Sequence, residues 1–187
     1  MHTPTPPEVT PTGAALDRLD DEVAGYGRAI ETAVAARAAG YAVPSSREEG
    51  ADLVRRAGAL ADQAVRGSSR DHDRARALRK VAGHLHTLDA ELADPGLGAE
   101  ALEVVAKALA AGLDVFARPD IQGLARLQDR VDLLLDHVEH HTGLRRAAVL
   151  LLGIGTAAEF SWENHPHLRR AEPVGDGLRY SPLISSR

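Results

Sequence analysis

An apolar segment near the end of the chain constrains the fold more than any other feature of the sequence. Residues 147–158 read AAVLLLGIGTAA and are apolar on every side of a helix, whereas the other helical segments carry a polar face. A helix that is apolar all round belongs in the interior of a bundle or in a membrane. Because a membrane span needs about 20 residues, this shorter run predicts a central core helix.

Prolines mark the ends of the other helices. Pro44, Pro95, Pro119 and Pro166 stand between helical patterns, and proline lacks the N–H that a helix interior requires. Between these breaks, apolar residues recur at steps of three and four, which is the spacing of one buried helix face. The pattern predicts helices over about 14–39, 46–64, 70–93, 99–116, 119–141 and 144–162.

Length and composition suit one helical domain. The chain has 187 residues, of which 44% are hydrophobic and only 3% aromatic, so its core must consist of small aliphatic side chains. Residues 1–12 contain four prolines and predict a disordered arm, residues 13–165 form the bundle, and residues 166–187 predict an extended tail. We expect an all-α, single-domain bundle of about six helices, mainly up-and-down, with the apolar helix at its centre.

Charge and cysteine content exclude several classes of function. The net charge is -5 with acids and bases interspersed, and Asp71 and Asp73 dilute a basic stretch between Arg66 and Lys80, so we expect no nucleic-acid partner and no membrane partner. The absence of cysteine excludes disulfides, thiol nucleophiles and cysteine-bound metals. The N-terminus lacks the basic start and apolar core of a signal peptide, which favours a cytoplasmic location.

Two local patterns predict particular contacts. Ser46 and Glu49 have the spacing of a capping box, in which each side chain bonds a backbone N–H at the start of a helix. Gly153 and Gly155 each cost about 1 kcal/mol relative to alanine inside a helix. We therefore expect a neighbouring helix, or a bound molecule, to approach the apolar helix closely there.

The residues after the apolar helix predict a site. Glu159 and Glu163 lie one helical turn apart on a shared face, and Trp162 stands between them. A carboxylate at the edge of an apolar core is expected to have a raised pKa, which suits a general acid or base. In an up-and-down bundle, Asp114 of the fourth predicted helix falls at the same end.

These residues lead to our main functional hypothesis, a small-molecule-binding protein whose activity, if it has one, would be cofactor-independent acid–base catalysis. The reaction would be an elimination, a cyclisation or an isomerisation, and the pattern leaves open whether the protein is an enzyme at all. The proposed proton-transfer residues are Glu159, Asp114 and His165, and the proposed substrate-binding residues are Trp162, Glu163, His167, Arg169 and Arg170.

Two other functions fit the sequence. His137 and His141 are four residues apart and could ligate one metal ion, completed by His84 or Glu103 from another helix. Histidines at a helix C-terminus are also favoured by the helix dipole, so this metal signal is weak. The other alternative is a non-catalytic partner or scaffold protein that uses its C-terminal tail to bind a second copy or another protein.

Overall fold

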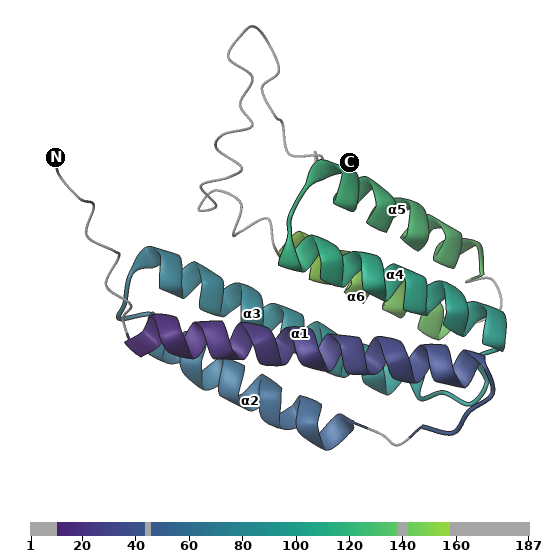
Figure 1. The fold of residues 1–187 in the computed structure, drawn as a ribbon, viewed down its shortest axis with the longest axis horizontal. Helices are drawn as coiled ribbons and strands as arrows, with labels where there is room; N and C mark the ends of the chain where they lie inside the picture. Colours follow the sequence, from purple (N-terminus) through teal and green to yellow (C-terminus); the bar gives the residue numbers. More distant parts are fainter. Residues whose placement is uncertain (1–10, 44–45, 138–141, 158–187) are drawn as a thin grey trace, which may run out of the picture.

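The computed structural model describes residues 11–43, 46–137 and 142–157. These residues form helices with no strand among them, so the predicted all-α bundle is confirmed (Figure 1). The helices are α1 (Pro11–Ala38), α2 (Arg47–Ala64), α3 (Ser69–Leu92), α4 (Ala99–Ala117), α5 (Ile121–Asp136) and α6 (Thr142–Ala157).

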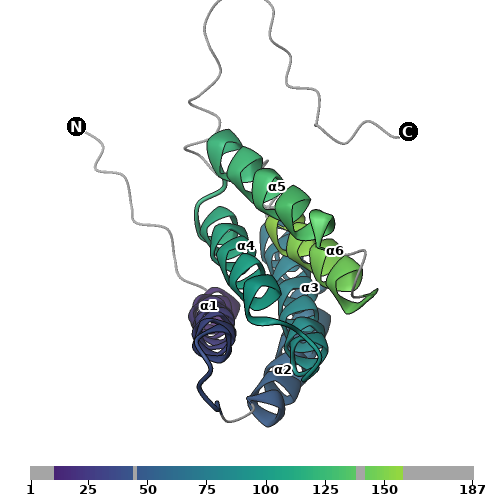
Figure 2. The ribbon, with the colours of Figure 1, turned by 90° about the vertical axis from the view of Figure 1, so that its right-hand side faces the viewer.

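The helices pack as two layers of three. Helices α1, α4 and α5 follow one another in one layer, and helices α2, α3 and α6 follow one another in the other (Figure 2). Contacts of α1 with α2 and α3, and of α6 with α4 and α5, hold the layers together. Consecutive helices run in opposite directions, as predicted, because the short connections of an up-and-down bundle join neighbouring ends (Figure 1).

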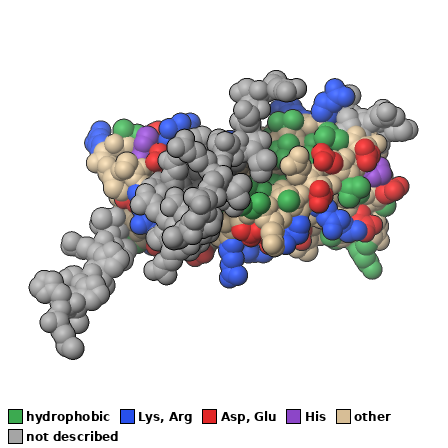
Figure 3. Space-filling model, turned by 90° about the horizontal axis from the view of Figure 1, so that it is seen from above, with side chains coloured by type: hydrophobic (Ala, Val, Ile, Leu, Met, Phe, Trp, Pro, Cys, Tyr) green, Lys and Arg blue, Asp and Glu red, His purple; other side chains and the backbone are tan. Residues whose placement is uncertain are grey.

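Helix α6 is buried on three sides, where it contacts α3, α4 and α5. Its fourth side faces outward, with Val149 64% exposed and Leu152 38% exposed, so the central position expected from its apolar sequence holds on three sides only. The physical reason is the two-layer arrangement, in which the last helix of a layer has an open flank. Apolar side chains also lie among charged ones on the face seen in Figure 3, and such scattered exposure is common in folded proteins.

The predicted close approach at the two glycines of α6 is confirmed. A Cβ atom on Gly153 would lie 2.6 Å from Nε2 of His84 on α3. A Cβ atom on Gly155 would clash with the Cδ2 atom of Leu127 on α5. Glycine therefore lets α6 approach helices of both layers, and this packing offsets its poor helix propensity.

The core is aliphatic, as the composition predicts, with one exception. Leucine, valine, isoleucine and alanine make up nearly all of the buried cluster, whereas Tyr26 of α1 is 2% exposed and carries a polar hydroxyl into it. No other polar side chain among the described residues is fully buried. None of the described helices combines the length and hydropathy that crossing a bilayer would require.

Several local predictions are corrected by the structure. Helix α2 does begin after Ser46, but the Ser46 side chain makes no capping bond, because its hydroxyl donates to Asp89 of α3 instead. Asp120, rather than Pro119, begins α5 as its N-cap and accepts a hydrogen bond from Gly123 N at 2.6 Å. The first turn of α1 holds no acid, and further along the helix Asp17 and Asp20 pair with Arg74 of α3 while Glu22 pairs with Arg56 of α2.

The α1–α2 connection is set by a glycine turn. Gly40 has a φ of 85°, which is the left-handed conformation that favours glycine. Its N–H bonds to Arg37 O at 2.9 Å, and Tyr41 N–H bonds to Ala36 O at 3.0 Å, which is the Schellman pattern of a helix C-terminus. The turn directs residues 41–43 along the end of α3.

Candidate functional site

Most residues of the site predicted at the end of the apolar helix lie outside the described residues. These are Glu159, Trp162, Glu163, His165, His167, Arg169 and Arg170. Asp114 is described, and its side chain is exposed in the last turns of α4. Its neighbour Val115 lies 3.9 Å from the Cβ position of Gly155, so the C-terminal ends of α4 and α6 do lie at the same end of the bundle. The acid–base site therefore stays a prediction.

The metal hypothesis rests on residues that are only partly described. His137 is the C-cap residue of α5, and His141 lies outside the described residues. His84 packs against Gly153 of α6, and burial, aided by the nearby charge of Lys80, lowers the pKa of His84. The described part of the chain holds no group of three or more His, Asp or Glu side chains placed to bind one metal ion.

A polar cluster that the sequence did not predict joins the first three helices. The Tyr26 hydroxyl donates to Oδ2 of Asp89 at 3.1 Å, and the Ser46 hydroxyl donates to the same oxygen at 3.3 Å. Asp89 is only partly buried, whereas Tyr26 is almost fully buried. Burial and the negative charge of Asp89 hold the pKa of Tyr26 well above its ordinary value, so the phenol stays a neutral donor.

Gly50 and His86 complete the surroundings of the Tyr26 hydroxyl. A Cβ atom on Gly50 would lie 2.5 Å from Cζ of Tyr26 and closer still to its Oη, so only glycine leaves room for the ring between α1 and α2. The same position is 3.0 Å from Nδ1 of His86, and this buried nitrogen has no hydrogen-bond partner in the structure. The cluster is thus tightly packed but not fully satisfied, which is uncommon for buried polar atoms.

Asp89 also lines a groove at the surface, which we call the Asp89 groove. The groove has a volume of about 380 Å³ and lies between the C-terminal parts of α1 and α3, beside residues 41–43. Its walls are largely apolar. Among the residues that line it are Ala33, Val34, Arg37, Val43, Asp89 and Leu92.

The other charged group in the Asp89 groove is Arg37. Its guanidinium donates from Nη1 to Leu92 O and from Nη2 to Asp94 O, the latter at 3.1 Å. Arg47 of α2 donates in the same way to Ala90 O at 3.0 Å. These two arginines satisfy carbonyl oxygens at the C-terminus of α3, where the helix dipole favours positive charge. The C-terminus of α3, which forms one side of the groove, is therefore fixed by hydrogen bonds from α1 and α2.

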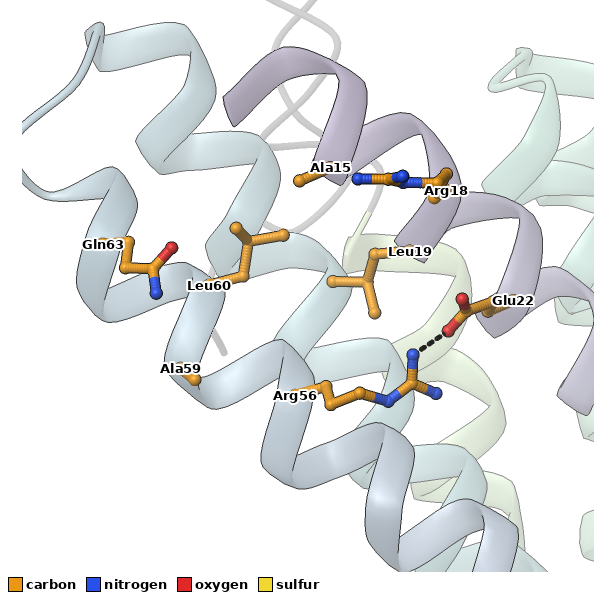
Figure 4. Close-up of a pocket in the computed structure, with 8 residues that line it drawn as sticks. All are labelled: Ala15, Arg18, Leu19, Glu22, Arg56, Ala59, Leu60 and Gln63. Atoms are coloured by element: carbon orange, nitrogen blue, oxygen red, sulfur yellow. Dashed lines mark hydrogen bonds and ion pairs between the residues drawn. The ribbon is translucent and has the colours of Figure 1, made fainter. Parts of the chain in front are cut away.

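Two further grooves are of similar size but differ in chemistry. The first, about 450 Å³, lies between α1 and α2, with Leu19 and Leu60 on its floor (Figure 4). Its Arg56 is paired across the groove with Glu22, so these charges already neutralise each other. The second, about 410 Å³, lies between α1 and α4 and has a floor of alanines. The Asp89 groove differs from these two because it contains a partly buried carboxylate that accepts hydrogen bonds from Tyr26 and Ser46.

Sequence reasoning missed this cluster for identifiable reasons. Tyr26 stands at a regular position of the apolar stripe of α1, so the periodicity assigns it to the core without indicating a partner for its hydroxyl. Ser46 has a complete local explanation as a capping residue. The available signal was that Tyr26 is an aromatic residue with a polar atom in a core stripe, and such atoms need a partner when buried.

Comparison with known proteins found no protein family, no curated protein and no solved structure that matches this chain.

Proposed function

We propose that this protein binds a small organic molecule in the Asp89 groove. The observation that supports the proposal is the state of Asp89. One carboxylate oxygen is held by hydroxyls of two other segments, Tyr26 and Ser46, while the other accepts no hydrogen bond from the described residues. Small-molecule sites combine apolar walls with a few fixed polar groups, and a carboxylate that is already oriented meets that requirement.

The chemistry of the cluster favours binding over proton transfer. Tyr26 is protonated at neutral pH, and its raised pKa moves deprotonation still further from that range, so it serves as a donor that orients Asp89. The volume of the groove falls in the range of small-ligand sites, which is about 300–1,000 Å³. The groove is open, so a single small ligand keeps part of its surface in water, and we expect weak affinity, with a Kd of about 0.1–1 mM.

A thermal-shift screen tests the proposal. A library of small amines, carboxylic acids and amino acids is added to the full chain, and a ligand that binds only the folded state raises the melting temperature. Ala33 lines the groove, so the Ala33→Trp variant fills it without removing a polar contact. The matched control is Ala35→Trp, which lies on the same helix but lines the α1–α4 groove.

The proposal predicts that hits stabilise the wild type and Ala35→Trp equally and leave Ala33→Trp unchanged. Each variant is compared with its own melting temperature without ligand, so a loss of stability from the tryptophan itself does not confuse the result. Hits that stabilise all three proteins to the same extent would place binding elsewhere and contradict the proposal.

A further inference from the structure

The Asp89 groove carries one negative group, Asp89, and one positive group, Arg37. Asp89 offers its second carboxylate oxygen, as described above. Arg37 donates one hydrogen bond to Leu92 O and one to Asp94 O, and an arginine side chain has five N–H donors in all. Both side chains therefore keep hydrogen-bonding capacity for a ligand.

The two groups line the same groove and meet α3 at positions three residues apart. The Arg37 guanidinium contacts the carbonyl oxygen of Leu92, which follows Asp89 by three residues on the same helix. At 1.5 Å per residue this corresponds to about 4.5 Å along the helix axis.

The apolar lining supplies the rest of the recognition. Val34 and Leu92 are buried walls of the groove, and Val43 lies on its rim. An aliphatic side chain placed against them would be removed from water, which contributes about 25 cal/mol for each Å² of apolar surface buried. The groove thus offers a carboxylate, a guanidinium and an aliphatic surface within the size of one small molecule.

We infer that the ligand of the Asp89 groove is a small zwitterion of the α-amino acid type with an aliphatic side chain. This inference rests on the proposed function. The ammonium group donates to the second oxygen of Asp89, the carboxylate accepts from Arg37, and the side chain contacts Leu92. A zwitterion compensates the charges of both Asp89 and Arg37, whereas a simple amine compensates only that of Asp89 and a simple acid only that of Arg37.

Three compounds with the same branched body test the inference. They are L-leucine, 3-methylbutylamine, which lacks the carboxylate, and 4-methylpentanoate, which lacks the ammonium group. Binding is followed by NMR titration of the methyl signals of Val34 and Val43 in the full chain. We expect L-leucine to bind at least about tenfold more tightly than either single-charge compound, which is a difference of about 1.4 kcal/mol.

Variants assign each charge to its partner. Asp89→Asn keeps an acceptor for Tyr26. It is expected to lower the affinities for L-leucine and the amine about tenfold and to leave the affinity for the acid unchanged. Arg37→Gln is expected to weaken L-leucine and the acid while leaving the amine unchanged, with Arg37→Lys as the conservative variant if the cap on α3 is needed for folding. Asp62→Asn and Arg55→Gln, at exposed positions on α2, are the matched controls and leave all three affinities unchanged.

The possible failures are distinguishable. If the amine or the acid binds at the Val34 and Val43 methyls as tightly as L-leucine, the zwitterion inference is overturned and the groove remains a small-molecule site. If none of the three compounds shifts those signals, and the screen with Ala33→Trp finds no ligand either, both the inference and the proposed function are wrong.

Discussion

At the scale of single residues, Tyr26 has the most consequences for this fold. A phenol in an otherwise aliphatic core requires a partner for its hydroxyl, and Asp89 supplies it from α3. The same contact orients the carboxylate that faces the groove. One side chain thus connects the packing of the first three helices with the candidate site.

Removing the Tyr26 hydroxyl is expected to destabilise the protein. The Tyr26→Phe variant loses a hydrogen bond to a carboxylate and should lower the free energy of unfolding by about 1.5–3 kcal/mol at neutral pH. Urea unfolding measures the change. Tyr41→Phe is the control, because Tyr41 is 70% exposed and its loss of a hydroxyl should cost almost nothing.

The raised pKa of Tyr26 also predicts a pH dependence. Above about pH 10, the ordinary pKa of tyrosine, the unfolded chain releases the phenol proton while the folded chain retains it. The unfolded state then binds fewer protons than the native state, so the free energy of unfolding falls as the pH rises. The wild type should lose stability from about pH 10 upward more steeply than Tyr26→Phe, and parallel curves for the two proteins would contradict this assignment.

Glycine at position 50 gives a prediction with an internal control. Gly50→Ala places a methyl group against the buried ring of Tyr26, and overpacking of this kind costs about 1–3 kcal/mol. Gly58→Ala on the same helix meets no atom within 4 Å and should stabilise the protein by about 0.5–1 kcal/mol through helix propensity. Thermal unfolding of the two variants should therefore show shifts of opposite sign.

At the scale of secondary structure, the sequence predicted what depends on local rules. Helix ends follow the prolines, and the Ser68 side chain caps α3 by accepting a hydrogen bond from Asp71 N at 3.1 Å. Ser46 shows the limit of that reasoning, because its hydroxyl bonds to a carboxylate 43 residues away. The candidate groove could not be predicted either, since it forms only when the ends of α1 and α3 meet.

The close packing of α6 against α5 at Gly155 can be tested directly by substitution. Gly155→Ala adds a methyl group against the side chain of Leu127, which is 1% exposed. We expect a loss of about 1–3 kcal/mol in the free energy of unfolding. Gly83→Ala, in the interior of α3 with no atom within 4 Å of the added Cβ, is the control and should be neutral or stabilising. Equal effects would show that helix propensity alone accounts for both changes.

At the scale of the whole molecule, the Asp89 groove and Asp114 lie toward opposite ends of the bundle. Glu91 of α3 pairs with Arg146 near the start of α6 at 2.8 Å, whereas His84, earlier in α3, packs against Gly153. The helices are therefore antiparallel, and the Asp89 groove lies toward the end of the bundle where α6 begins. Ala157, the last residue of α6, lies about 16 Å from Arg146 along the axis of α6, at 1.5 Å per residue.

This separation makes the groove and Asp114 independent in experiment. Because Asp114 lies near the C-terminal end of α6 and Glu159 follows Ala157 by two residues in the sequence, Asp114→Asn and Glu159→Gln should leave the affinity of the groove for L-leucine unchanged within about twofold. Asp89→Asn should lower that affinity about tenfold. NMR titration of the Val34 methyl signals measures all three variants. A large effect of Glu159→Gln on the affinity for L-leucine would contradict this independence and would show that Glu159 is coupled to the groove.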